Sequence, residues 1–170
     1  NNSGKSNGVK KAIKISKGFK IVLYDSDLPY FKYLKKFFVN LKIFKLVIVN
    51  RRHKNSNMII ENKRIYNFIR IFIGNFISLI NFHIFKIKTK DTQAGLKGFL
   101  NLPEFKKKKF VSKRFFLDIE IISFFKKKNI EPFDISVNFT LDKNKSSIKI
   151  FDFKTNIEII REYIKVIKNI

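Results

Sequence analysis

Residues 19–29 read FKIVLYDSDLP, and the interpretation of the fold starts from this stretch. Its first part, FKIVLY, is short, mostly apolar and rich in residues that favour strands, which is typical of a buried parallel strand. The strand runs directly into two carboxylates, Asp25 and Asp27, and Pro29 is suited to the first turn of a helix. The stretch therefore predicts a strand that ends in an acidic pair and is followed by a helix.

The segments around this stretch alternate in the same way between helix and strand. Apolar spacing in residues 9–17 predicts a helix that stops at Gly18, and residues 44–49 (FKLVIV) predict a second strand that ends at Asn50. Further elements are predicted as an apolar helix over 65–85, a helix near 115–128, a strand near 133–139 and a helix near 156–168. This alternation predicts an α/β fold with a mostly parallel central sheet.

Length and composition limit the class of protein. A chain of 170 residues suits one domain, and 45% hydrophobic residues, including 21 Phe, predict a packed core and exclude disorder for most of the chain. Because the chain has no Cys, a disulfide scaffold, a thiolate nucleophile and a Cys-ligated metal are excluded. The chain begins at Asn1 with a polar segment that does not resemble a signal peptide, so we expect a processed protein or a fragment.

The charge leaves two explanations open. Lys and Arg total 37 against 13 Asp and Glu, a formal net charge of +24 that would suit a nucleic acid or an anionic membrane as partner. However, Lys, Ile, Phe and Asn make up 97 of the 170 residues, and all four can be encoded by triplets of A and T alone. Drift in base composition would therefore raise the charge of solvated faces without any partner.

Charged residues gather where the predicted strands end. In open α/β sheets ligands bind at the carboxyl ends of strands, where Asp25 and Asp27 could hold a divalent cation that bridges to a diphosphate. Alternatively, Asp27 could cap the helix that follows it. Arg51 and Arg52 end the next strand, where they would either bind phosphate oxygens or lie in a solvated loop. Asp91 precedes a Gly-containing turn and suits either a turn or general-base chemistry.

Seven segments occur in a diagnostic order: NNSGKSNGVKKA, YDSDLP, VNRR, the apolar stretch 65–85, DTQAGLKGF, FFLDIEII and FDISVNF. This order resembles the family 2 glycosyltransferases that load a sugar onto a polyprenyl phosphate, of the dolichyl-phosphate β-glucosyltransferase type. The segment DTQAGLKGF (91–99) is the most specific of the seven. The resemblance covers nearly the whole chain and starts inside the family pattern, without the first βα units.

The resemblance implies a GT-A-type, Rossmann-like sandwich in which residues 1–170 form a single partial domain, the C-terminal portion of the enzyme. It implies transfer of a sugar from a nucleotide diphosphate sugar, UDP-glucose, to a polyprenyl or dolichyl phosphate, with a divalent cation (Mg²⁺ or Mn²⁺) as cofactor. Its motifs assign metal binding to Asp25 and Asp27. They assign donor and phosphate contacts to Lys5, Arg51, Asp118 and Glu120, and a catalytic role around the acceptor to Asp91, Gln93 and Lys97.

The apolar stretch 65–85 has the length of a membrane helix. Five polar or charged residues interrupt it, namely Asn67, Arg70, Asn75, Asn81 and His83. It is therefore expected to be an interfacial or core helix, and the lysines would attract anionic headgroups. These features predict a peripheral protein on the cytoplasmic face of a membrane, with no nucleic acid partner. The alternatives are a basic nucleic-acid- or ribosome-associated domain and an inactive remnant of the transferase.

Overall fold

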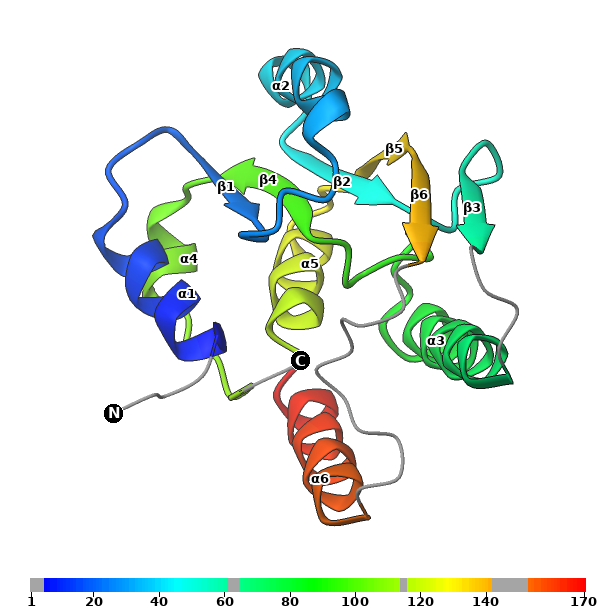
Figure 1. Ribbon diagram of the computed structural model, residues 1–170. Helices are drawn as coiled ribbons and strands as arrows, with labels where there is room; N and C mark the ends of the chain where they lie inside the picture. The colour runs from blue at the N-terminus through cyan, green and yellow to red at the C-terminus, as the bar shows by residue number, and fades with distance from the viewer. Residues whose placement is uncertain (1–4, 61–64, 114–115, 142–152) are drawn as a thin grey trace.

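The central sheet contains four strands in the order β1-β4-β2-β5 (Figure 1). The computed structural model describes residues 5–60, 65–113, 116–141 and 153–170. The four strands are β1 (Lys20–Tyr24), β2 (Leu46–Asn50), β4 (Leu96–Leu100) and β5 (Phe133–Ser136). Strand β4 is antiparallel to both β1 and β2, whereas β2 and β5 are parallel. The protein therefore has a mixed α/β fold.

The sheet differs from the mostly parallel one that the sequence predicts, because β4 lies between β1 and β2. Gly98 of β4 is the register partner of Val22 on one side and of Val47 on the other. The hydrophobic pattern gives no sign of a strand over 96–100, since Lys97 and Gly98 interrupt it. The prediction of a mostly parallel sheet is thus wrong because of one short strand, β4, which contains a charged residue and a glycine.

A second sheet of two strands pairs β3 (Asn57–Ile60) with β6 (Asn138–Leu141) in parallel. The sequence predicts one strand over 133–139, but the structure divides it at Val137, so that β5 joins the central sheet and β6 joins β3. The Ser56 hydroxyl holds this division in place. It accepts a hydrogen bond from Val137 N–H at 3.0 Å and donates one to the carbonyl of Asn50 at 2.6 Å.

The helices largely follow the predicted ranges. They are α1 (Lys5–Ile15), the short 3₁₀ helix η1 (Phe31–Tyr33), α2 (Leu34–Ile43), α3 (Ile65–Phe85), α4 (Pro103–Lys107), α5 (Leu117–Lys127) and α6 (Phe153–Asn169). The helix predicted to open at Pro29 begins later, since the chain turns at Leu28, whose φ is 48°, and η1 precedes α2. Among the described residues, no helix is long and apolar enough to cross a membrane.

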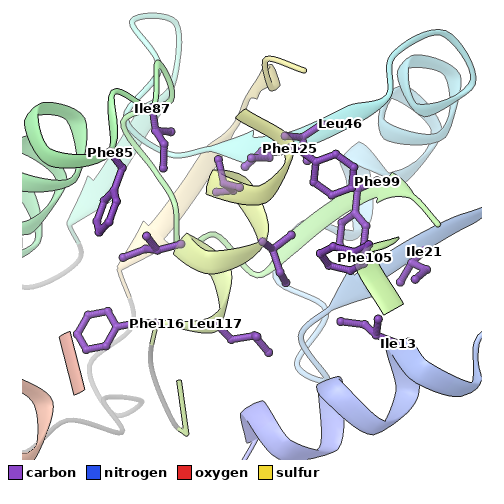
Figure 2. Close-up of a cluster of buried hydrophobic side chains, with 14 of the residues drawn as sticks. Ile13, Ile21, Leu46, Phe85, Ile87, Phe99, Phe105, Phe116, Leu117 and Phe125 are labelled. Carbon is purple, nitrogen blue, oxygen red and sulfur yellow. The ribbon is translucent and has the colours of Figure 1, made fainter. Parts of the chain in front are cut away.

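The larger core lies between one face of the sheet and α5, where Figure 2 shows the rings of Phe99, Phe105 and Phe125 close together. The ring centroids of Phe99 and Phe105 are 5.1 Å apart, and those of Phe105 and Phe125 are 5.5 Å apart. All three side chains are fully buried. Burial of each contributes about 1.5–3 kcal/mol, so this aromatic group is a main source of stability.

A smaller core covers the opposite face of the sheet, beneath α2. Side chains of β2 alternate between the two cores, because successive residues of a strand point to opposite faces. Val47 and Val49 belong to the smaller core, whereas Leu46 and Ile48 belong to the larger one. Helices on both faces therefore bury the central strand completely, which holds its carboxyl end rigidly in place.

Gly98 lets α2 approach β4 closely. A Cβ atom at this position would lie 2.8 Å from Leu41 Cδ2 and 2.9 Å from Phe37 Cζ, closer than real Cβ contacts come. The glycine in the DTQAGLKGF segment thus has a packing role. It lets Leu41 and Phe37 of α2 pack directly against the backbone of β4.

Candidate functional site

Arg51 and Asp91 form a bidentate ion pair at the carboxyl end of β2. Arg51 Nε and Nη2 donate to the two carboxylate oxygens of Asp91 at 2.6 and 2.8 Å, and the Arg51 backbone N–H donates to Oδ2 at 2.9 Å. Arg52 Nη1 lies 3.3 Å from Oδ1 of the same carboxylate. Asp91 is completely buried, whereas each arginine side chain remains 27% exposed. A buried carboxylate therefore anchors two guanidinium groups that reach the surface.

Burial and the arginines act in opposite directions on Asp91. Burial raises the pKa of the carboxyl group, but the hydrogen bonds and charge of Arg51, together with the charge of Arg52, hold that pKa below its ordinary value. Burial lowers the pKa of the Arg52 guanidinium, an effect that the Asp91 charge opposes. Asp91 is therefore an ionised, weakly basic carboxylate, and its surroundings favour a positioning role over general-base chemistry.

Asn50, the last residue of β2, fixes the backbone that carries the two arginines. Its Oδ1 accepts a hydrogen bond from Arg52 N–H at 2.8 Å, and its Nδ2 donates to Asp134 Oδ2 at 2.7 Å and to Thr89 Oγ1 at 3.3 Å. Burial raises the pKa of Asp134, although the hydrogen bonds with Asn50 and Thr89 lower it. Sequence reasoning gave Asn50 and Asp134 no role; Asn50 is the one polar residue of the apolar strand β2, and Asp134 lies on β5.

The acidic pair lies at the carboxyl end of β1. Asp25 N–H donates to the carbonyl of Gly95 at 2.8 Å, and the Asp25 carboxylate pairs with Lys5 of α1. A Cβ on Gly95 would lie 2.8 Å from Asp25 Cγ, so the glycine makes room for this carboxylate. Asp27 is exposed. The next helical turn begins after Tyr30 without a side-chain cap, so the alternative that Asp27 caps a helix is wrong.

Tyr30 is a buried tyrosine that feels the charges of both the acidic pair and Arg51, and sequence reasoning missed it. Its side chain is buried and interacts electrostatically with Arg51, Asp91, Asp25 and Asp27. Burial raises the pKa of Tyr30 to about 12. The charge of Arg51 opposes this increase, and the charges of the carboxylates add to it. The phenol is therefore neutral at physiological pH. Its only sequence signal is that it directly follows the DSDLP motif.

Lys97 of the DTQAGLKGF segment and Asp118 of α5 form a second ion pair. Lys97 Nζ lies 2.6 Å from Asp118 Oδ1 and donates to the carbonyl of Thr92 at 3.3 Å. The Lys97 side chain is 4% exposed and that of Asp118 is 27% exposed. Asp118 stands in the first turn of α5, where a negative charge suits the helix dipole. Gln93 is exposed in the loop between Asp91 and β4.

Glu120 is not brought together with these residues. It is fully buried on α5, where its carboxylate accepts hydrogen bonds from Val111 N–H at 3.0 Å and Ser112 N–H at 2.8 Å. Asn169 near the end of α6 donates a third at 3.3 Å. These contacts tie the segment before α5 to α6, so the surroundings of Glu120 are those of a structural carboxylate and not of a donor-binding one.

The described residues contain no group of three or more His, Cys, Asp or Glu side chains that could hold a metal ion. Asp25 and Asp27 offer two carboxylates, which are the hard oxygen ligands that Mg²⁺ and Mn²⁺ prefer. A bound diphosphate and water would have to complete the coordination shell. Because Lys5 pairs with Asp25, a cation would also have to displace the Lys5 ammonium group.

We define the strand-end cluster as Asp25, Asp27, Arg51, Arg52 and Asp91. Comparison with known proteins adds no assignment, since the sequence matches no protein-family model and no curated protein. The function is therefore inferred from the residues of this cluster and their geometry.

Proposed function

We propose that the chain is the C-terminal portion of a family 2 glycosyltransferase with a GT-A-type fold. It transfers a sugar, which we propose to be glucose, from a UDP-sugar to a polyprenyl phosphate. The observation that carries this proposal is that motifs far apart in the sequence meet at one edge of the sheet. Because Tyr24 of β1 pairs with Leu96 of β4, the residues after β1 and before β4 share that edge. Such strand ends are where α/β sheets bind ligands.

The chemistry of the proposed reaction suits the strand-end cluster. An oxygen of the acceptor phosphate attacks the anomeric carbon, and the bond from that carbon to the nucleoside diphosphate breaks. Negative charge develops on the leaving diphosphate, and guanidinium groups such as those of Arg51 and Arg52 bind phosphate oxygens well. Because Asp91 already holds Arg51 in place, little side-chain freedom is lost when a phosphate binds. A divalent cation at Asp25 and Asp27 would neutralise further charge.

The acceptor phosphate is already ionised, so the reaction needs little general-base help. This agrees with an Asp91 that is buried and held as a carboxylate by Arg51. In the proposal Asp91 positions Arg51, and the Lys97–Asp118 pair positions the loop between Asp91 and β4 against α5. The Arg51–Asp91 and Lys97–Asp118 pairs thus hold the site in place, and the more exposed side chains of the strand-end cluster contact the substrates.

Two further features support the proposal. Strand β1 lies at the edge of the central sheet, which is the position where the additional βα units implied by the resemblance would pair. The acceptor is a lipid, and we therefore propose that the protein works as a peripheral protein on the cytoplasmic face of a membrane. The net charge of +24 suits an anionic surface.

The test measures binding of pyrophosphate to the chain by calorimetry, with and without Mn²⁺. We expect binding that depends on Mn²⁺ and that Asp27→Asn weakens at least about tenfold, since even indirect partners of metal ligands matter that much. Asp27 is exposed, so this substitution should leave the fold intact. Glu104→Gln is the matched control, because it neutralises another exposed carboxylate outside the strand-end cluster.

Two results would contradict the proposal. One is pyrophosphate binding that Mn²⁺ and Asp27→Asn leave unchanged. The other is no pyrophosphate binding together with tight, salt-dependent binding of RNA, which would favour a basic nucleic-acid-binding domain.

A further inference from the structure

Helix α3 exposes a continuous apolar surface, which we call the outer face of α3. Its members recur every three or four residues, so they lie on one side of the helix. They are Phe68, Ile69, Phe72, Ile73, Phe76, Leu79 and Phe82. Phe72 is 72% exposed, the largest fraction in this group. Isolated exposed apolar residues need no explanation, but a helix face of this extent marks an interaction surface.

Polar side chains of α3 attach it to the rest of the protein, in addition to Phe85, which is buried in the larger core. Asn75 Oδ1 accepts a hydrogen bond from Arg52 Nε at 3.0 Å. The Ser78 hydroxyl donates to the carbonyl of Lys90, and Asn81 Nδ2 donates to Thr92 Oγ1 at 3.4 Å. These three side chains contact Arg52, which pairs with Asp91, and the two residues on either side of Asp91 in the sequence. A shift of α3 would therefore move Arg52 and the residues next to Asp91.

Gly74 strengthens this connection. A Cβ atom there would lie 2.5 Å from Arg52 Nη2, so the guanidinium lies directly against the backbone of α3. A side chain at position 74 would push Arg52 away from both Asn75 and Asp91. The close approach of helix and arginine is thus built into the sequence by a glycine.

The occupant of the outer face must match its charge. Immediately after α3, Lys86, Lys88 and Lys90 are exposed, while Ile87 and Thr89 between them are buried. Residues 65–90 contain no Asp or Glu. An apolar helix face next to a row of lysines suits the interface of an anionic bilayer, where each lysine contributes about 1 kcal/mol. A second copy of this chain would bring another charge of +24 and be repelled.

We propose that α3 docks on an anionic membrane through its outer face, and that its polar side transmits this docking to the loop that carries Asp91. Docking removes apolar area from water and fixes the helix. The hydrogen bonds of Asn75, Ser78 and Asn81 then restrain Arg52 and residues 90–92. The inference rests on the proposed function in assigning Arg52 and Asp91 to a substrate site.

The first test measures docking by sedimentation with vesicles of phosphatidylcholine alone or mixed with phosphatidylserine. We expect binding only to the mixed vesicles, weakened by salt, and reduced about tenfold or more by Phe72→Ser, because a buried Phe contributes at least that much. Phe19→Ser is the matched control, because Phe19 is 80% exposed and belongs to the connection between α1 and β1. Figure 1 shows this connection on the side of the molecule away from α3.

A second comparison tests the lysines. Lys88→Gln with Lys90→Gln should weaken binding to the mixed vesicles more than Lys11→Gln with Lys14→Gln, which removes the same charge from α1. Three results would overturn the proposed docking surface. They are equal effects of the two lysine pairs, equal effects of Phe72→Ser and Phe19→Ser, and binding of RNA without binding of vesicles.

The final test measures transmission by amide hydrogen exchange with and without mixed vesicles. We expect docking to slow exchange at residues 89–92. In the variant Asn75→Ala with Ser78→Ala the apolar residues of the outer face are unchanged, so docking should persist, while the slowing at 89–91 should be reduced because the bonds to Arg52 and Lys90 are removed. Unchanged exchange on docking of the parent chain, or full slowing in the variant, would overturn the proposal. If the chain docks with slowed exchange but binds no pyrophosphate, the docking inference is supported and only the proposed transferase function is contradicted.

Discussion

The Arg51 guanidinium and the Asp91 carboxylate make two parallel hydrogen bonds, at 2.6 and 2.8 Å, between segments that lie 40 residues apart. This fork geometry fixes both the distance and the plane of the guanidinium. The end of β2 and the loop before β4 are thereby locked together. The behaviour of this pair provides the most direct check of the site.

Asp91→Asn should lower the free energy of unfolding by about 3–5 kcal/mol, because it leaves the partly buried charge of Arg51 without its partner. Urea denaturation of the parent and the variant measures this. The double variant Arg51→Met with Asp91→Leu is the control, since it removes both charges. It should be more stable than Asp91→Asn. If the double variant is the less stable of the two, the ion pair itself is a larger source of stability than we infer.

Tyr30 should give the protein a distinct response to alkaline pH. Its pKa in the folded protein is about 12, above the value of about 10 for an unfolded chain, so the folded state favours the neutral phenol. The stability from this group is complete below about pH 10 and is lost as the pH rises toward 12. Ultraviolet titration of phenolate should show one fewer late-titrating group in Tyr30→Phe. Tyr163, whose burial also raises its pKa to about 12, should still titrate late in that variant.

Gly95→Ala should displace the Asp25 carboxylate, because the added Cβ would lie 2.8 Å from Asp25 Cγ. We expect Mn²⁺-dependent binding of pyrophosphate to weaken about tenfold, the effect typical for disturbed metal surroundings. Gly8→Ala is the matched control. A Cβ at Gly8 meets nothing within 4 Å, and alanine in α1 should stabilise the protein by about 0.5–1 kcal/mol. Pyrophosphate binding that falls equally in both variants would argue against a site at Asp25.

The Lys97–Asp118 pair should respond unequally to the loss of each partner. Asp118→Asn leaves the buried Lys97 ammonium uncompensated and should cost about 3 kcal/mol in the free energy of unfolding. Lys97→Met leaves Asp118, which is 27% exposed and therefore hydrated, so it should cost about 1 kcal/mol. Thermal or urea unfolding of the two variants decides the order. The reverse order would mean that Lys97 reaches water more easily than its burial indicates.

The sequence predicts those elements whose hydrophobic period is clear. The stretch 65–85 is an uninterrupted helix with those bounds, and the strand within 19–24 ends at Tyr24, directly before the acidic pair. β4 could not be predicted, because Lys97 and Gly98 reflect distant partners. Lys97 is on a buried strand only because Asp118 faces it, and Gly98 is there because α2 packs on it. Neither contact leaves a local pattern.

The candidate site shows the same division. The rule that ligands gather at strand ends correctly brings Asp25 and Arg51 to one edge of the sheet. It cannot reveal that Arg51 is held by Asp91, that Lys5 pairs with Asp25, or that Tyr30 is buried where the charges of both groups affect its pKa. Glu120 fits a motif, yet its carboxylate serves backbone N–H groups. Such partners depend on tertiary packing, which single-sequence patterns do not encode.

The position of β4 between β1 and β2 has a consequence for the order of folding. Among the described strands, neither β1 nor β2 has a pairing partner before residues 96–100, and β5 and β6 come later still. Within the described residues, no strand pairs with its neighbour in the sequence. Such long-range pairing makes folding slow. During synthesis on the ribosome, β1 and β2 would emerge before β4, so a chain cut before Leu96 should collapse without forming the β1-β4-β2 part of the central sheet.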